Sequence, residues 1–563
     1  MEKYYQRMLK DSDERVVRAL QRQILDEKNS RYGGFADANG MVQAKNSIYE
    51  TAAMVVAYCN EDSNYYHNEM ILERIMLGLK YVRSVQHENG LFDYVTCNFF
   101  SAPDTAFCVI KLIMPYLYLS NKYGADTVKG TIPEEGNPTG EIAVWKAMHV
   151  IIRSGCFGLL EGGFHTPNHR WAIAALLMQG ANFFESQEMR DAAQLYLNEG
   201  IDGNDDGEYA EKSAGNYNGV NNNAMIALAH ATGDDSYDQY VIRNLRMMLT
   251  YWEPDDSIFT ANSTRFDKDR LVYPVNYYMQ YLQMGMKYNI PEFLQMCNYI
   301  LKIVEEKHIE SSDDIVGFMI NPEFRSFEYD GAYNTPDYRA YYVESGIARS
   351  RAGRFTYTVM KGKSNFFYIH NGTMKLEMKV GGSFCEHRAF KAQQMERISE
   401  KEYHLSQTMR GWYYLPFKEK PATSDWWKMD NASRELKLGP DMQIDVWVKE
   451  VEHGVDVRVK TSGVEGAPWR IELAFSGVNF LTNDYMDMPL SGSEVLVVKQ
   501  GYTEVSNGKD ALIVGPCFGE HHFTEGKEDS EAKTAGAATL YLTAYTGFDH
   551  TIEIRNKRST YDK

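Results

Sequence analysis

The hydrophobic period of this chain changes once, near residue 350, and this change constrains the fold more than any other feature. Before it, apolar residues recur three and four apart, as in helices with one buried face, over segments 50–60, 69–86, 105–123, 169–184 and 223–233. After it, apolar and polar residues alternate between Gly or Asn turns, over segments 354–362, 365–372, 374–382, 443–463, 470–477, 538–547 and 550–556. The sequence therefore predicts a helical domain over residues 1–340 and an antiparallel β-sandwich over residues 341–563.

Turns rich in Gly or Asp, each carrying an aromatic residue, recur at similar intervals through the helical part. They lie at residues 32–35, 89–93, 162–164, 206–209 and 255–259. Such recurrence is typical of stacked helical hairpins, each of which needs its neighbours to bury its apolar face. We therefore expect an (α/α) toroid, an incomplete helical barrel, with one set of loops gathered at its mouth.

Charge and cysteine content restrict the partners and the compartment. The 563 residues carry a formal net charge of −18 and no run of Lys or Arg, which argues against nucleic acid or an anionic membrane as partner. The seven cysteines are scattered without a CxxC pair, and the charged N-terminal segment has no apolar stretch of a secretory signal. We expect a cytoplasmic protein, although a secreted chain with its signal removed would look the same. The oligomeric state stays open.

The sharpest local motif is Glu161-Gly-Gly-Phe-His-Thr-Pro-Asn-His-Arg-Trp171. Thr166 is a good N-cap and Pro167 a good first residue, so a helix is expected to begin here and run through Phe184. That helix places Asn168, His169 and Arg170 in its first turn, behind His165. Its positive end favours a bound anion and a neutral imidazole that is able to accept a proton. A solvated, capped helix start is the bland alternative.

A second motif covers residues 206–223, Asp-Gly-Glu-Tyr-Ala-Glu-Lys-Ser-Ala-Gly-Asn-Tyr-Asn-Gly-Val-Asn-Asn-Asn. A turn is followed by a polar stretch, and an apolar helix is expected to begin near Ala224. Tyr217 lies among Asn and Gly residues rather than in an apolar stripe, so core packing explains it poorly. The run of Asn that contains Asn222 serves equally well to cap a helix or to offer amide donors to a carboxylate.

These two motifs, in this order, resemble the α/α-toroid polysaccharide lyases, which include the heparinase II/III-like, alginate and chondroitin/hyaluronan lyases. The succession of a helical toroid and a β-sandwich, covering nearly the whole chain, is similar too. The resemblance implies cleavage of uronic-acid glycans by β-elimination, without a required cofactor. It further implies that Asn168 neutralises the uronate carboxylate, and that His169 and Tyr217 act as base and acid. Arg170 matches no fixed position of these families.

The chemistry accounts for these residue types. Removing the weakly acidic C5 proton of a uronate places charge on its carboxylate, and donors aimed there are worth about 3–4 kcal/mol each in related oxyanion sites. A positioned base and acid add about 10²–10⁴-fold. Tyr suits protonation of the O4 leaving group, and it also serves as base where cations stabilise its charged form.

Weaker candidates complete the predicted site. Asn98, in the polar loop before Asp104, and Arg265, in the loop 257–267, are expected to contact substrate. The alternatives are that Asp104 caps the following helix and that Arg265 forms a surface ion pair. Tyr338 and Arg339, near the domain junction, are also candidates for contact with substrate, as are His165, Arg170 and Asn222. In the β domain, Glu386 and His387 are weak candidates for a divalent metal site. The three residues Trp412, Trp426 and Trp427 are interpreted as core in preference to a sugar platform.

Other functions remain open at this point. A glycoside hydrolase of glucuronides or unsaturated uronides on the same toroid needs two carboxyl groups, which Asp104, Asp206, Glu208 and Glu211 supply. A non-catalytic glycan-binding protein predicts aromatic platforms without an acid and a base, and a sugar epimerase would use the same proton abstraction. In each reading the partner is an acidic oligo- or polysaccharide.

Overall fold

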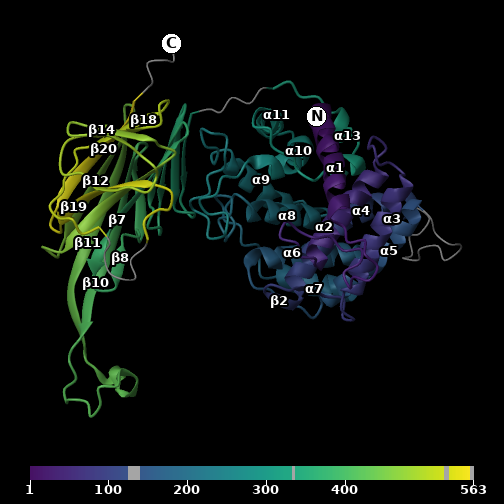
Figure 1. The fold of residues 1–563 in the computed structure, drawn as a ribbon, viewed down its shortest axis with the longest axis horizontal. Helices are drawn as coiled ribbons and strands as arrows, with labels where there is room; N and C mark the ends of the chain where they lie inside the picture. Colours follow the sequence, from purple (N-terminus) through teal and green to yellow (C-terminus); the bar gives the residue numbers. More distant parts are fainter. Residues whose placement is uncertain (125–139, 332–336, 525–531, 558–563) are drawn as a thin grey trace. The chain divides into compact units, whose positions relative to one another are not determined.

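The computed structural model describes residues 1–124, 140–331, 337–524 and 532–557, which fall into two compact units (Figure 1). The helical unit consists of residues Met1–Tyr251 and Ser257–Asn334. The β unit consists of Trp252–Asp256 and Thr335–Lys563. The predicted order of a helical toroid and then a β-sandwich is confirmed. The assignment of the short segment Trp252–Asp256 to the β unit was not foreseen.

The helical unit is built from helices that pair along the chain, with one short hairpin of strands. Its elements are α1 (Glu2–Arg22), α2 (Ala44–Cys59), α3 (Glu69–Ser84), β1 (Phe92–Tyr94), β2 (Asn98–Ser101), α4 (Ala102–Tyr123), α5 (Gly140–Gly158), α6 (Pro167–Phe183), α7 (Gln187–Leu197), α8 (Tyr217–Thr232), α9 (Ser236–Met248), η2 (Pro274–Tyr277), α10 (Tyr278–Tyr288), α11 (Pro291–Glu306), α12 (Val316–Ile320) and α13 (Glu323–Ser326).

These helices form two layers, as stacked hairpins require. Helices α2, α4, α6 and α8 pack one against the next, and each also packs on the helix that follows it in the chain. Helix α6 buries eleven of its 17 residues, whereas the following helix α7 buries Met189 and Ala193 of its 11. Helix α6 is therefore buried on most of its surface, while α7 shows the one-sided pattern of a surface helix.

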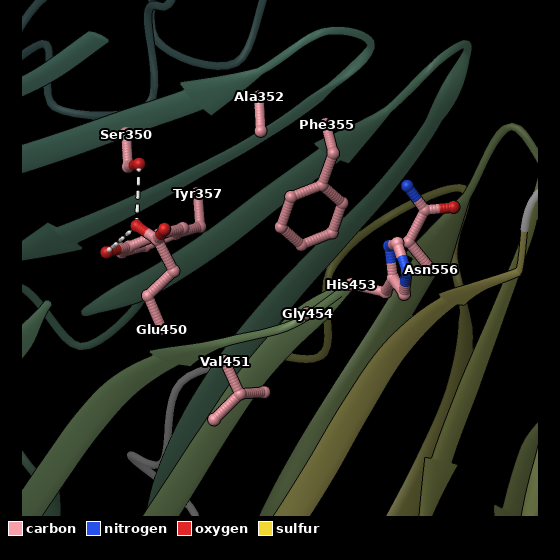
Figure 2. Close-up of a pocket in the computed structure, with 9 residues that line it drawn as sticks. All are labelled: Ser350, Ala352, Phe355, Tyr357, Glu450, Val451, His453, Gly454 and Asn556. Atoms are coloured by element: carbon pink, nitrogen blue, oxygen red, sulfur yellow. Dashed lines mark hydrogen bonds between the residues drawn. The ribbon is translucent and has the colours of Figure 1, made fainter. Parts of the chain in front are cut away.

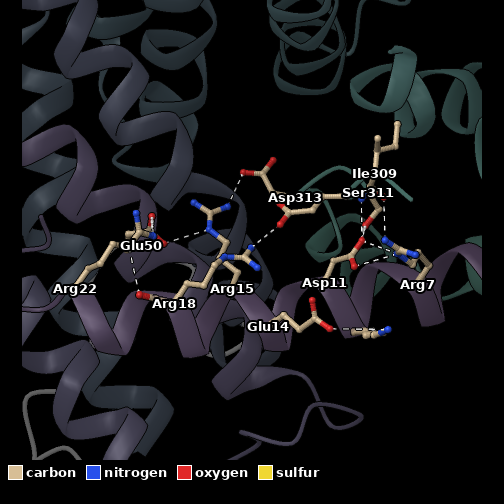
Figure 3. Close-up of polar contacts among 12 residues, drawn as sticks. Arg7, Asp11, Glu14, Arg15, Arg18, Arg22, Glu50, Ile309, Ser311 and Asp313 are labelled. Carbon is tan, nitrogen blue, oxygen red and sulfur yellow. Dashed lines mark hydrogen bonds and ion pairs between the residues drawn. The ribbon is translucent and has the colours of Figure 1, made fainter. Parts of the chain in front are cut away.

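Helix α1 joins the two ends of this arrangement. The ring of Tyr4 stacks on that of Tyr278 in α10, with centroids 3.5 Å apart. Arg15 lies between Glu50 of α2, at 3.3 Å, and Asp313, at 3.2 Å (Figure 3). Because these partners come from opposite ends of the helical unit, α1 closes the succession of hairpins.

The glycines of the recurring turns have a steric role. Gly90 has φ +88°, and a Cβ there would lie 1.9 Å from the carbonyl oxygen of Ser154 in α5. Gly207 has φ +99°, and its Cβ would lie 2.4 Å from the carbonyl oxygen of Arg243 in α9. Each turn thus docks its backbone directly on a surface helix, which a residue with a side chain would prevent.

The β unit contains two nine-stranded sheets. Its strands are β3 (Tyr338–Tyr342), β4 (Ile347–Ala352), β5 (Phe355–Met360), β6 (Phe367–Asn371), β7 (Met374–Phe384), β8 (His387–Ala389), β9 (Gln394–Ser399), β10 (Glu402–Tyr414), β11 (Leu436–Val451), β12 (Gly454–Ser462), β13 (Pro468–Ser476), β14 (Phe480–Asn483), β15 (Asp487–Pro489), β16 (Val495–Val497), β17 (Thr503–Ser506), β18 (Ala511–Gly515), β19 (Ala538–Tyr545) and β20 (Asp549–Lys557). Two short 3₁₀ helices, η3 (Trp426–Lys428) and η4 (Asn431–Ser433), lie between β10 and β11.

One sheet runs β15-β14-β17-β18-β20-β12-β11-β10-β9 and the other β16-β19-β13-β7-β6-β5-β4-β3, with β8 paired to β7. A single apolar core takes residues from both sheets, for example Leu376 and Ile471 from one and Val446 and Ile552 from the other. This is the predicted sandwich. Among the named strands of the described residues, the pairings are antiparallel apart from that of β16 with β19, which is parallel.

Candidate active site

Three of the polar loops that the sequence singled out, with the neighbouring loop 257–267, meet within the helical unit. The backbone N–H and the hydroxyl of Thr264 donate to the carbonyl oxygen of Glu211, at 3.2 and 2.8 Å. The amide of Asn98 donates to Nε2 of His165 at 3.3 Å. Since Asn98 precedes α4 and His165 precedes α6, the contacts bring the ends of successive hairpins together, as a toroid requires.

Asn168 is fully buried in the first turn of α6. Its side-chain Nδ2 donates to both carboxylate oxygens of Glu211, at 2.9 and 2.8 Å, and to the hydroxyl of Thr166 at 3.0 Å. Its backbone N–H also donates to Glu211, at 3.2 Å. Thr166 is the predicted N-cap, but its hydroxyl receives this side chain instead of a backbone N–H. The amide hydrogens of Asn168 are thus committed to protein groups.

Glu211 connects Asn168 to a cation and a phenol. Nε of Arg265 lies 3.3 Å from a Glu211 carboxylate oxygen, and the Arg265 guanidinium lies over the ring of Tyr217, 5.1 Å from its centroid. The Arg265 side chain keeps 31% of its surface exposed, against 4% for Glu211. Burial raises the pKa of Glu211, although the hydrogen bonds from Asn168 and the charge of Arg265 oppose that rise. The result is a continuous chain, Asn168–Glu211–Arg265–Tyr217.

Tyr217 is the first residue of α8, seven residues before the predicted start of that helix. Its backbone N–H donates to the hydroxyl of Ser213 at 3.1 Å, and its ring meets Phe266 edge-to-face, with centroids 5.7 Å apart. The tyrosine is half-buried. The helix begins earlier than predicted because the Asn residues that follow Tyr217 are helical, although their sequence is typical of a loop.

His169 is held neutral by its surroundings. Its ring packs edge-to-face on Phe107, with centroids 5.7 Å apart. Burial lowers its pKa to about 4, and the positive charges of Arg265 and Lys45 act in the same direction, against Asp104. Nδ1 accepts the backbone N–H of His165 at 3.3 Å. In the neutral imidazole the proton therefore sits on Nε2, which makes that nitrogen a donor.

Asp104 and Lys45 complete the surroundings of His169. Ser101 is the N-cap of α4: its hydroxyl accepts the backbone N–H of Asp104 at 3.2 Å and donates to the Asp104 carboxylate at 2.6 Å. Asp104 is therefore the partner of the cap and not the cap itself. Nζ of Lys45 lies 3.9 Å from that carboxylate. Asn98 also donates to Ser101, at 2.9 Å.

Two predicted contact residues have other partners. Arg170 donates to Glu199 at 2.9 Å, and its guanidinium lies over the ring of Trp171. Asn222 is fully buried, accepts from the hydroxyl of Tyr209 at 3.0 Å, and donates to Asn244 and Gln280, both at 2.9 Å. Its amide thus belongs to a hydrogen-bonded network between helices.

Known structures share this architecture. A xanthan lyase from Paenibacillus has a TM-score of 0.55 at 10% identity, over 99% of this chain, and the chain spans 59% of the length of that lyase. A chondroitinase AC lyase, solved in complexes with oligosaccharides, has a TM-score of 0.52 at 9% identity, over 99% of this chain and 83% of its own. The chondroitin AC lyase of Streptomyces coelicolor A3, in complex with chondroitin sulphate, has a TM-score of 0.51 at 11% identity, over 100% and 80%.

The chain shares the fold of these three structures, a helical toroid followed by a β-sandwich. At these identities the likeness concerns the fold alone. No protein-family model matches the sequence, and no curated protein matches it either.

Tyr338 and Arg339 belong to the β unit. The hydroxyl of Tyr338 accepts from Arg349 at 3.5 Å. Arg339 forms a two-pronged ion pair with Glu450, one prong at 3.0 Å. Glu450 also accepts from Ser350 at 2.9 Å and lines a small pocket of the β unit (Figure 2). Of the polar groups at this pocket, Ser350 and Tyr357 are thus paired with Glu450.

The metal and platform candidates of the β unit lie at its surface. Glu386 is exposed and His387, the first residue of β8, is half-buried. Across the described residues, no group of three His, Cys, Asp or Glu side chains has the arrangement of a metal site. The interpretation of the tryptophans as core is wrong for Trp426 and Trp427, which are 53% and 90% exposed, while Trp412 is half-buried. Along the described parts of the chain, no helix is both long and apolar enough to cross a membrane.

Sequence reasoning treated Glu211 as a hydrolase carboxylate and missed its contacts with Asn168 and Arg265. The sequence did contain a signal that Glu211 is buried, because this residue follows the 206–209 turn by two residues and that turn ends in the buried Tyr209. The pairing itself joins residues 43 positions apart, which no local pattern reveals.

Proposed function

We propose that this protein is a polysaccharide lyase, which cleaves uronic-acid-containing glycans by β-elimination and leaves 4,5-unsaturated uronate ends. The proposal is carried by one observation: a phenol, a guanidinium and a neutral imidazole, from Tyr217, Arg265 and His169, stand on adjoining loops of a toroid. The likeness in fold to xanthan lyase and chondroitin AC lyase supports it, since those proteins are by name lyases of polysaccharides.

Arg265 is the best group to neutralise the uronate carboxylate. It is partly exposed, and Glu211 and the Tyr217 ring fix its position. The sequence-based hypothesis gave this role to Asn168, but the hydrogens of that amide are committed to Glu211 and Thr166. We therefore assign Asn168 as a positioning residue that orients Glu211, and through it Arg265. A fixed cation at the developing enolate is worth several kcal/mol because it needs no reorganisation during the reaction.

Tyr217 is assigned the proton transfers. As a phenolate, its oxygen takes the C5 proton, and the neutral phenol that results returns a proton to the O4 leaving group. The adjacent guanidinium stabilises the phenolate that begins this cycle and is restored at its end. His169 is assigned as a hydrogen-bond donor, since its Nδ1 lone pair is occupied by the N–H of His165. The Nε2–H group then adds a second donor for the substrate carboxylate.

One observation favours the hydrolase alternative. Burial raises the pKa of Glu211, as a general acid of a glycosidase requires. The ion pair with Arg265 and the bonds from Asn168 nevertheless suit an ionised carboxylate.

The test is ultraviolet absorbance over time with glucuronan, hyaluronan, chondroitin, heparosan, alginate and rhamnose–glucuronate polymers offered separately. We expect one of them to give the conjugated signal of an unsaturated uronate. The Tyr217→Phe variant should lose at least about 10²-fold in kcat, while Tyr413→Phe, at an exposed tyrosine of the β unit, should match wild type. Wild-type rates in Tyr217→Phe would remove Tyr217 from the mechanism. New reducing ends without ultraviolet signal would replace the lyase by the hydrolase.

A further inference from the structure

The segment Arg410–Asp441 leaves the core of the β unit as a long arm. Met409 is the last core residue of β10 before the arm and Met442 is the first core residue of β11 after it, and both are fully buried. Every residue between them is described, and of these Gly411 alone is buried. The two strands run out past the rest of their sheet and end in η3 and η4 (Figure 1). A two-stranded ribbon is marginally stable in water without further packing.

One face of the arm is apolar. Trp412 lies opposite Leu438 and Tyr414 opposite Leu436 in the strand register, so all four side chains project from the same face. Leu438 is 59% exposed, Leu436 49% and Tyr414 46%. The rings of Trp412 and Tyr414 meet edge-to-face, with centroids 5.5 Å apart, so the face is continuous. We call these four residues the arm face.

Hydrogen bonds within the arm hold its exposed residues in place. Arg434 donates to the carbonyl oxygens of Tyr414 and Leu415, at 3.1 and 3.0 Å, and its guanidinium lies over the Tyr414 ring. At the tip, the carboxylate of Asp425 accepts the backbone N–H of Trp427 at 3.1 Å and so fixes the most exposed tryptophan. A face that is held in place before it binds loses little entropy on association.

The charge and the composition of the arm restrict which partner can cover the arm face. The arm contains six Lys or Arg and five Asp or Glu, so it is nearly neutral in a chain of net charge −18. A nearly neutral ribbon suits neither nucleic acid nor an anionic lipid surface. The rings of Trp412 and Tyr414 stand at 79° to each other and Leu436 and Leu438 carry no ring, so the face is not the flat platform on which a pyranose stacks, which argues against a glycan as occupant.

The arm of a second copy of the chain is nearly neutral and has the same apolar face, so it suits the arm face as a partner. Two copies with charge −18 repel each other over most of their surface, and the arm is a place where that repulsion is small. An apolar face that meets itself across a two-fold axis is matched in polarity, because the same patch supplies both sides of the contact. Exposed Trp, Tyr and Arg are the residues that dominate such contacts.

We propose that the arm Arg410–Asp441 is a dimerisation arm, and that the arm faces of two copies pack against each other about a two-fold axis. Each copy then covers Leu436 and Leu438 of the other. Because the contact is apolar and the two bodies repel, the dimer strengthens as salt screens that repulsion.

The test is sedimentation velocity of the full chain at several protein concentrations, at low and at high salt. We expect a dimer that grows with concentration and with salt. Leu438→Asp removes one leucine from each copy and places a charge in the contact, so the dimer dissociation constant should rise at least about 100-fold. Leu195→Asp, at a leucine of α7 that is 70% exposed, is the matched control and should dimerise as wild type does.

Circular dichroism shows whether the Leu438→Asp chain is folded, and Leu436→Lys supplies a second variant with the same expected loss. A wild-type chain that stays monomeric up to about 100 μM would overturn the proposal, as would equal dimerisation of wild type and both arm variants. A glycan that binds a monomeric chain through Trp427 would overturn it as well. The outcome does not depend on the lyase proposal, because sedimentation requires no substrate.

Discussion

The protonation of His169 follows from its packing and can be measured directly. Burial lowers its pKa from 6.5 to about 4, with Phe107 against the ring and Arg265 and Lys45 adding to the effect. At pH 5 an ordinary histidine is about 97% protonated, whereas a pKa of 4 leaves about 9% protonated. A lowered pKa disfavours the charged form, so His169 stays neutral throughout the range above about pH 5.

Removing the aromatic neighbour should reverse part of this shift. In Phe107→Ala, water reaches the imidazole, and since burial is the largest cause, the pKa should rise by at least about one unit. Half of the His169 side chains would then be protonated near pH 5. The control is Phe99→Ala, which removes a 66% exposed phenylalanine of β2 and should leave the pKa unchanged.

The assay is an NMR titration of the histidine ring signals between pH 3.5 and 8, a range of about four and a half units, with the signal of His169 identified by its absence from His169→Gln. A wild-type titration near 6.5, or an unchanged pKa in Phe107→Ala, would refute the reasoning. In the catalytic assay, His169→Gln keeps an N–H donor and should retain more activity than His169→Ala, which loses one donor and about 10²–10³-fold. Equal loss in both variants would instead identify His169 as the base.

Further predictions follow from the same contacts. Arg265→Lys should lower kcat by about 10-fold or more, because an ammonium cannot meet Glu211 and the carboxylate in one plane; an unchanged kcat would contradict the role of Arg265. Glu253→Gln should destabilise the β unit by about 3–5 kcal/mol, since it leaves the buried Arg349 without its carboxylate at 3.0 Å, and denaturant unfolding checks this. Burial raises the pKa of Glu253, but the interactions with Arg349 and His370 outweigh burial and hold that pKa below its ordinary value. The stabilisation by the ionised Glu253 is therefore present above about pH 4.5, the pKa of this group in the unfolded chain, and is lost on acidification below it. Gly90→Ala should destabilise the helical unit by more than about 1 kcal/mol, whereas Gly40→Ala, which has open space around its Cβ, should cost less.

Much of the fold could be predicted because its signals are local. The strands over 354–362, 365–372 and 470–477 appear as β5, β6 and β13, since alternation reports directly which side chains face the core. Helix α6 begins at Pro167 as predicted. The start of α8 was missed because its first turns carry Asn222 and other amides inward, where they bond to Gln280 and Asn244, and a polar residue that is buried by partners far along the chain looks like a loop.

The candidate site could also be predicted only in part. The pairing of an Asn-His helix start with Tyr217 was visible as residue types in polar settings, but the partners of each group were not. Arg265 was predicted to contact substrate, with a surface ion pair as the alternative, but its contacts with Glu211 and Tyr217 depend on the closing of loops more than 40 residues apart. Trp412, Trp426 and Trp427 were interpreted as core because tryptophans are on average highly buried, and only the strand register shows that β10 and β11 extend beyond their sheet.

The measurement that tests the central claim most directly is mass spectrometry of the products formed in water enriched in ¹⁸O. Elimination breaks the C4–O bond without adding water, so the account predicts an unsaturated fragment one water lighter than its saturated counterpart, and a new reducing end that retains the glycosidic oxygen. Incorporation of ¹⁸O at that new reducing end, with no loss of mass in the other fragment, would establish hydrolysis and contradict the assignment of a lyase.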